Sequence, residues 1–167
     1  MASCAGVSNS ELTRAKTIAI SREQFAASPF GFDLTLNNFE NHYKKELKRQ
    51  RYFFRNVVNS AQPDTIYRYY RGKTKILFYK PVRLEARIVG GTIRKPEVEL
   101  RNGIRVGLSR KEFFWRFTDW AYDESDSLTI ESPVIGCTVT FIFKRDKINE
   151  IQVAGKMMKK SSAPGEK

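Results

Sequence analysis

The sequence predicts an α+β fold in which two tandem units, each a helix followed by an antiparallel hairpin, share one antiparallel sheet with the helices on one face. Two observations carry this prediction: a helix-start pattern occurs twice, and a pair of alternating strands follows each occurrence. The 167 residues suffice for one well-buried domain or for two halves of about 80 residues that share a sheet. We expect a tail at 1–28, a tandem domain at 29–155 with units at about 29–95 and 100–155, and a disordered basic tail at 156–167.

The helix-start pattern is Leu-[Thr/Ser]-x-x-x-Phe-x-x-x-[Tyr/Phe], which begins at Leu34 and again at Leu108. The hydroxyl residue after each leucine is a good N-cap, because its side chain accepts a hydrogen bond from an unpaired amide of the first turn. In the second copy, Ser109 and Glu112 also have the spacing of a capping box. The aromatic residues four positions apart lie on one helical face, so each copy predicts the start of a helix.

The hairpin of the first unit is expected at 65–71 and 74–80, on either side of Gly72-Lys73. Glycine at the first loop position suits a type II′ turn, which pairs Arg71 with Thr74. This register places Tyr67, Tyr69, Ile76 and Phe78 on one face, which we predict to be the core side. The other face then carries Ile66, Arg68, Tyr70, Lys75, Leu77 and Tyr79.

The hairpin of the second unit is expected at 137–144 and 148–153. A two-residue loop would place Phe141 opposite Glu150, whereas a three-residue loop places it opposite Ile151. We therefore predict a three-residue loop, which keeps apolar side chains together on one face. Further strands are expected at 84–93, 100–106 and 127–131, and one face of the sheet should remain open to water.

Composition narrows the class of protein. The chain is 41% hydrophobic and 13% aromatic, which is typical of folded globular proteins rather than disordered chains. No apolar run reaches the roughly 20 residues that a helix needs to cross a bilayer. The net charge of +12, from 30 basic and 18 acidic residues, favours anionic partners such as nucleic acid, a phosphorylated glycolipid or an acidic protein face.

The two cysteines have different expected roles. Cys4 ends the tripeptide Ala-Ser-Cys, which resembles the end of a bacterial lipobox and marks Cys4 as a candidate lipid-attachment site. The alternative is a chance tripeptide in a disordered leader. Cys137 starts an apolar strand and should be a small buried hydrophobe. Two cysteines and His42 fall short of the usual four zinc ligands, so we expect no metal and no cofactor.

Two groups of residues are candidate binding sites. Tyrosine and arginine are favoured contact residues because they combine a large surface with directional donors, so we predict a partner-binding site at Arg68, Tyr70, Lys75 and Tyr79. The alternative is an open face that is merely solvated, or that the N-terminal segment covers. A dense basic run, expected on a helix, is either a solvated face or an anion-binding patch that weakens with salt; it consists of Lys44, Lys45, Lys48, Arg49 and Arg51.

Catalysis is not expected. His42 is the only histidine, and the chain contains neither a G-x-S-x-G nor an H-E-x-x-H motif. The interpretation of His42 without a function is a half-buried or surface residue of the first helix. We therefore predict a protein that is not an enzyme.

The repeated residues described above resemble a signature of a known protein family. The segment from Asn102 to Phe113, with Gly107-Leu108-Ser109 at its centre, resembles the strand-to-helix signature of small envelope lipoproteins related to the outer-membrane assembly lipoproteins SmpA/OmlA. The same signature occurs in β-lactamase-inhibitor-protein-like (BLIP-like) domains. The stretch Asp64-Thr65-Ile66-Tyr67 and the turn at Gly72-Lys73 look like the central hairpin of uncharacterised BLIP-like lipoproteins of Bacteroides-type bacteria.

The resemblance covers residues 30 to 155 approximately and implies a tandem pair of α+β units that form one curved antiparallel sheet with helices on its convex side. It does not extend to β-lactamase inhibition, because nothing matches the inhibitory loops. The first copy departs from the signature, with Asp33 where the second has Gly107.

The expected function is a non-catalytic binding domain of the cell envelope, in the periplasm or on the outer-membrane surface, that recognises an unknown protein or glycan through the open sheet face. Membrane association would come only from a lipid on Cys4. The alternative is a basic cytoplasmic protein that binds nucleic acid or another polyanion. Nucleic acid is not the expected partner, because no RNP-like strand signature occurs.

Overall fold

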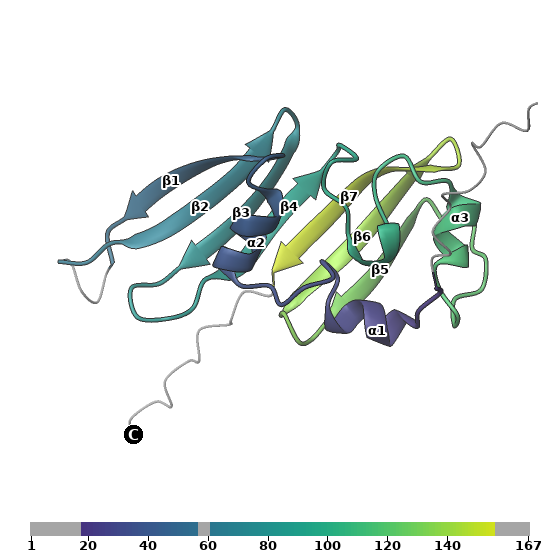
Figure 1. The fold of residues 1–167 in the computed structure, drawn as a ribbon, viewed down its shortest axis with the longest axis horizontal. Coiled ribbons are helices and arrows are strands. Elements are labelled where there is room, and N and C mark those ends of the chain that lie inside the picture. The colour runs from purple at the N-terminus through teal and green to yellow at the C-terminus, as the bar shows by residue number, and fades with distance from the viewer. Residues whose placement is uncertain (1–17, 57–60, 156–167) are drawn as a thin grey trace, which may run out of the picture.

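The computed structural model describes residues 18–56 and 61–155, which form a seven-stranded antiparallel sheet with three α-helices (Figure 1). The α+β class predicted from the sequence is therefore confirmed. The helices are α1 (Arg22–Ala27), α2 (Leu36–Tyr43) and α3 (Arg110–Trp115). The strands are β1 (Lys48–Phe54), β2 (Asp64–Arg71), β3 (Thr74–Lys80), β4 (Arg87–Ile93), β5 (Ser127–Ser132), β6 (Cys137–Lys144) and β7 (Lys147–Gly155).

The strand order is β1-β2-β3-β4-β7-β6-β5, so the chain builds the sheet from both edges toward the middle. Strands β1 to β4 follow one another as neighbours. The chain then crosses to the opposite edge, where β5 begins, and returns through β6 to β7, which pairs with β4. Figure 1 shows α2 over the half that contains β2 and β3, and α1 and α3 beside the half that contains β5 and β6.

The helix starts are fixed by local hydrogen bonds. The Thr35 hydroxyl accepts from the amide of Asn38 at 3.1 Å at the start of α2. The Ser109 hydroxyl accepts from the amide of Glu112 at 3.2 Å, and the Glu112 carboxylate accepts from the Ser109 amide at 3.2 Å. Both predicted helix starts and the predicted capping box are thus confirmed.

Aromatic contacts hold the helices against one face of the sheet. Phe39 of α2 packs on Tyr69 and Phe78, with ring centroids 5.0 and 4.9 Å apart. Phe113 of α3 lies 4.8 Å from Phe141 of β6. Phe25 of α1 packs 5.9 Å from the same ring. Because these strand residues share one face, the opposite face of the sheet is not covered by any helix of residues 18–56 and 61–155.

The first hairpin agrees with the predicted register. Arg71 pairs with Thr74 and Tyr69 pairs with Ile76. Gly72 has a φ of 55°, while Lys73 has no positive φ, as a type II′ turn requires. The two predicted faces of this hairpin are therefore confirmed.

The turn of the second hairpin differs from the prediction. Lys144 pairs with Lys147, so the loop has two residues, Arg145 and Asp146, and not three. Their φ values of 51° and 58° fit a type I′ turn. The three-residue loop is wrong because the sequence-based choice assumed an unbroken ladder.

A β-bulge restores the predicted pairing of the apolar residues. Phe143 pairs with Ile148 and Ile142 pairs with Glu150, so Asn149 is the extra residue. This shift of one position sets Phe141 opposite Ile151, as predicted. Burial of the apolar face thus decides the register, and the bulge accommodates the shorter turn.

Two further predictions of secondary structure are wrong. The basic run is not helical: α2 ends at Tyr43, and Lys48 begins the edge strand β1, where aromatic residues at its far end favour a strand. No strand spans 100–106 either. Asn102 and Gly103 have φ values of 63° and 72° and bend the chain into a tight turn, as Asn-Gly pairs commonly do. The strand expected at 84–93 begins only at Arg87.

The segment predicted as an N-terminal tail contains a packed helix. Within 1–28, α1 inserts Phe25 into the core, where its side chain is 0% exposed. The backbone of Ile20 also pairs with Phe117. Cys4 and the predicted disordered tail at 156–167 lie outside the described residues.

Replacement of Gly91 by alanine tests the close approach of β3 and β4. A Cβ at Gly91 would lie 2.8 Å from the carbonyl oxygen of Lys75 and 3.1 Å from the Cα of Ile76. We expect Gly91→Ala to lower the free energy of unfolding by about 1–3 kcal/mol, because neighbouring backbone must shift. Chemical denaturation measures this change.

The matched control is Gly90→Ala. A Cβ there would meet only the carbonyl oxygen of Val153 at 3.4 Å, so the change should be neutral or stabilising by up to about 1 kcal/mol. Equal destabilisation by both substitutions would contradict the close approach at Gly91.

Candidate functional site

The face of the sheet opposite the helices, called here the open face, is crossed by two rows of side chains. Directly paired residues of neighbouring strands point to the same side of an antiparallel sheet. The Tyr70 row consists of Lys48, Tyr70, Lys75, Thr92, Gln152, Thr140 and Thr129. The Arg68 row consists of Gln50, Arg68, Leu77, Gly90, Ala154, Thr138 and Glu131.

Tyr70 lies at the centre of a cationic cluster. Lys48 of β1 and Lys75 of β3 pair with it from either side. The guanidinium of Arg68 lies 4.9 Å from the Tyr70 ring centroid, which is within cation–π range. Arg68 also donates to the Tyr52 hydroxyl at 3.4 Å. Strand pairing therefore brings three cations and two phenol rings together.

The two lysines of this cluster have no acidic partner in the described part of the chain. Within residues 18–56 and 61–155, neither Lys48 nor Lys75 forms an ion pair. Both side chains are exposed. The acid of the Arg68 row, Glu131, lies on β5 at the opposite edge of the sheet. The β1–β3 end of the open face is thus a positively charged surface with spare hydrogen-bond donors.

Tyr79 has a different role from the other predicted partner-binding residues. Its hydroxyl donates to Oδ2 of Asp64 at 2.6 Å, and Asp64 also accepts from the side-chain amide of Asn56 and the backbone amide of Val82. The Tyr79 hydrogen bond is the main cause that holds the pKa of Asp64 below its ordinary value. The same bond raises the pKa of Tyr79. The Tyr79 hydroxyl is therefore committed to a bond between the end of β3 and the start of β2.

Part of the basic run borders a pocket beside the Tyr70 row. This pocket of about 480 Å³ lies between the end of α2 and the first strands. Arg49 is paired with Glu40 at 2.5 Å, whereas Lys44 forms no ion pair among the described residues. Lys45 and Arg51 do not line the pocket. Its lining residues are Glu40, Lys44, Leu47, Lys48, Arg49, Tyr69 and Tyr70.

The two predicted binding groups meet at one point. Lys48, from the basic run, pairs directly with Tyr70, from the partner-binding group. Both residues also line the pocket. The helix predicted for the basic run does not allow this contact, which exists because Lys48 begins a strand. The available signal was the run Tyr52-Phe53-Phe54, which favours a strand over a helix.

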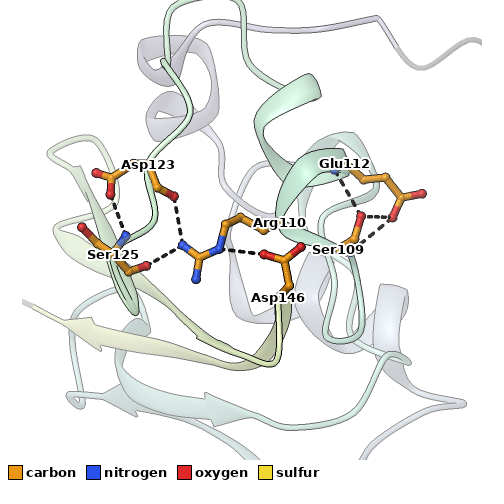
Figure 2. A network of polar contacts seen from close by, with 6 residues as sticks. All are labelled: Ser109, Arg110, Glu112, Asp123, Ser125 and Asp146. Carbon is orange, nitrogen blue, oxygen red and sulfur yellow. Dashed lines mark hydrogen bonds and ion pairs between the residues drawn. The ribbon is translucent and has the colours of Figure 1, made fainter.

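A second polar cluster lies at the other end of the molecule and is structural (Figure 2). The Arg110 side chain is only 7% exposed and donates to Oδ1 of Asp146 at 3.1 Å. It also donates to the carbonyl oxygens of Asp123 at 2.9 Å and Ser125 at 2.7 Å. Its guanidinium lies 4.3 Å from the Phe143 ring centroid. One side chain therefore joins α3, the β6–β7 turn and the loop before β5.

The other residues that could take part in catalysis or bind a metal pack as structural residues. The His42 ring packs 4.7 Å from Phe32 and 4.6 Å from Tyr43. Cys137 is buried, as predicted, and burial raises the pKa of its thiol to about 11. In the described ranges, no three His, Cys, Asp or Glu side chains gather as a metal site. None of the helices in those ranges has the length and apolar character required to span a membrane.

Comparisons of the chain with protein-family models, with curated proteins and with solved structures each found no match. The function therefore has to be inferred from the geometry of the site.

Replacement of Arg110 by methionine tests the structural role of the second cluster. Arg110→Met leaves two carbonyl oxygens and Asp146 without their donor, so we expect the free energy of unfolding to fall by about 2–3 kcal/mol. The control is Arg105→Met, which removes an exposed pair with Glu99 at 3.5 Å and should cost at most about 1 kcal/mol. Similar losses in both variants would contradict a special role for Arg110.

The Asp64–Tyr79 hydrogen bond predicts a pH dependence. Because the pKa of Asp64 is lower in the folded protein than in the unfolded chain, the bond stabilises the fold above about pH 4, and this contribution is lost as the pH falls through the folded pKa. Because the pKa of Tyr79 is raised, the contribution persists up to about pH 10 and is lost as the pH rises through the pKa of folded Tyr79. NMR titration of the Asp64 carboxyl carbon should show its pKa move upward in Tyr79→Phe. An unchanged Asp64 pKa in this variant would contradict the assignment.

Proposed function

We propose that this chain is a non-catalytic binding domain that recognises a protein or a glycan through the open face around Tyr70. The observation that carries the proposal is the cluster of Lys48, Arg68, Tyr70 and Lys75, in which two lysines have no ion-pair partner among the described residues. The helices use the other face for the core. A charged aromatic surface on the uncovered face is therefore left for contact with another molecule.

The side chains of this surface support binding rather than chemistry. Lysine, arginine, tyrosine, threonine and glutamine offer charge, stacking and hydrogen bonds. Nucleophilic catalysis needs a nucleophile beside a general base that a third group orients. The Tyr70 and Arg68 rows contain no such arrangement of residues.

We also propose that the sheet consists of two tandem α+β units, with α2 and β1 to β4 in the first and α3 and β5 to β7 in the second. Each unit would begin with a hydroxyl-capped helix, at Thr35 and at Ser109. The strand order, in which β4 of one unit pairs with β7 of the other, supports this division. This arrangement fits the resemblance to BLIP-like, SmpA/OmlA-related envelope lipoproteins.

The proposed location follows from that resemblance. If a signal peptide precedes Cys4, lipidation of this cysteine would tether the domain in the periplasm or at the outer-membrane surface; otherwise the protein would be cytoplasmic. The lipobox-like tripeptide is the support for the tether, since Cys4 lies outside the described residues.

Polyanion binding is the second candidate function. It is favoured by three cations that form no ion pair within the described part of the chain: Lys48 and Lys75 of the Tyr70 row, and Lys44 of the pocket that borders it. Such binding would weaken steeply as salt increases, because it depends on release of counterions. A specific contact with a protein or glycan would depend less on salt.

The test is capture of partners from an envelope extract at low and high salt, with identification by mass spectrometry. The variant Arg68→Ala/Tyr70→Ala/Lys75→Ala removes the cluster and leaves Tyr79, which bonds to Asp64, in place. We expect this variant to lose a partner that the wild type retains at high salt.

The matched control is Lys111→Ala/Trp115→Ala. It removes a cation and a 65% exposed aromatic ring from α3, 5.0 Å apart, on the helix side of the molecule. This control should bind like the wild type. Equal capture by wild type and cluster variant would contradict the proposed binding face, and capture of nucleic acid that salt abolishes would favour the second function.

A further inference from the structure

We propose that the ligand of the open face is an acidic oligosaccharide, with a carboxylate or sulfate held at Tyr70 and hydroxyl groups bound along the rest of the Tyr70 row. This inference rests on the proposed binding function and narrows its ligand class. Three features of the row carry it: its length, the distribution of its charges and the chemistry of its far half.

The Tyr70 row is an extended site rather than a point. It crosses all seven strands, from Lys48 on β1 to Thr129 on β5. Neighbouring strands lie about 4.8 Å apart, so six steps give a row of about 29 Å. A row of this length can contact several consecutive rings of an extended chain.

The anionic group of the ligand would bind at the β1–β3 end. Lys48 and Lys75 flank Tyr70 and have no ion-pair partner among the described residues. The Tyr70 hydroxyl likewise forms no hydrogen bond there, and Arg68 holds its ring from one side at 4.9 Å. Two ammonium groups and a phenol are therefore available to the same carboxylate or sulfate.

The far half of the row suits neutral sugar hydroxyls. Thr92, Gln152, Thr140 and Thr129 follow one another in register. The hydroxyls of Thr129 and Thr140 are 2.9 Å apart and share one hydrogen bond. A hydroxyl has one donor and two acceptor positions, so both retain the capacity to bond a ligand. Gln152 donates to the Glu150 carboxylate at 2.7 Å, so the three threonine hydroxyls are the uncharged groups that this half offers to a ligand.

The charge distribution argues against a single-stranded nucleic acid. Such ligands need cations along the whole path of the phosphate backbone. Beyond β3, however, the Tyr70 row contains no cation, and the Arg68 row ends in Glu131. Arg94, on the same side, is already bonded to Glu150 at 2.6 Å. Successive phosphates would therefore meet hydroxyls and a carboxylate.

Beyond β3, the two rows also lack the large side chains that anchor protein interfaces. Protein hot spots cluster around large side chains that insert into desolvated pockets. Leu77 and Ala154 are the aliphatic residues of the two rows, and Gly90 lies between them. A hydroxyl-rich chain with one anionic end matches these two rows better than a protein patch does.

Isothermal titration calorimetry with defined oligosaccharides tests the inference. The probes are a neutral hexasaccharide with one terminal uronic acid, the same chain with one terminal sulfate instead, the uronate probe with its carboxylate reduced to an alcohol, and oligothymidylate of similar length. We expect an acidic hexasaccharide to bind and the reduced one to bind at least about tenfold more weakly, a difference of about 1.4 kcal/mol. Comparison of the uronate and the sulfated probes shows whether the site binds a carboxylate or a sulfate.

Three double variants assign the contacts. Lys48→Ala/Lys75→Ala should weaken the acidic probe at least about tenfold and leave the reduced probe nearly unchanged. Thr129→Val/Thr140→Val should weaken both probes by a similar, smaller factor. The control Lys95→Ala/Lys111→Ala removes the same charge from the loop after β4 and from α3, and it should change neither. Thermal unfolding of each variant shows that binding is lost without loss of the fold.

Four outcomes would overturn the inference, and they separate it from the proposed function. Binding that is equal for acidic and reduced probes, or insensitive to the lysine variant, would contradict the anion subsite. Tighter binding of oligothymidylate than of the acidic oligosaccharides would identify nucleic acid, and not a glycan, as the ligand. No glycan binding, with an envelope protein captured through the open face, would reject the glycan and keep the binding function. No glycan binding and capture unaffected by the cluster variant would reject both.

Discussion

The pairing of β4 with β7 is the constraint on which the rest of the molecule depends. It joins the strands built from the first part of the chain to those built from the last part in one continuous sheet. Close backbone approach accompanies the junction: a Cβ at Gly155 would lie 2.4 Å from the carbonyl oxygen of Ile88. Without this pairing, each set of strands would expose an additional edge.

Continuous pairing has a consequence for both faces. Side chains alternate between the faces, and the register shifts in the β3–β4 and β6–β7 pairs leave the Tyr70 and Arg68 rows paired. The seven strands therefore have one apolar side that the helices cover and one polar side with rows of paired residues. The apolar side holds Phe39, Phe113 and Phe25 of the three helices. The polar side brings Lys48, Tyr70 and Lys75 together, although Lys48 is distant in sequence from the other two. The candidate site is therefore a product of strand pairing.

Local signals in the sequence were sufficient for the helix starts and for the first hairpin, because the N-caps at Thr35 and Ser109 and the turn at Gly72 depend on a few adjacent residues. Features that depend on distant pairing were missed. The basic run at the start of β1 has no strand signal of its own, and the pairing partner of β1 lies beyond a connecting segment, so a helix was the wrong prediction there. The bulge at Asn149 was also missed, because only the packed core makes it favourable. The partners of Arg110 come from two segments distant in the sequence, so no local signal predicts these contacts.

The central claim is that the open face around Tyr70 is the functional surface. Amide NMR spectra of the ¹⁵N-labelled protein, recorded during addition of an acidic oligosaccharide, test this claim most directly because they locate contact residue by residue. The account predicts that shifts concentrate on the amides of Lys48, Tyr70, Lys75 and Thr92 and spread along the Tyr70 row toward β5. Shifts confined to α1, α2 and α3, or no shifts at millimolar ligand, would contradict it.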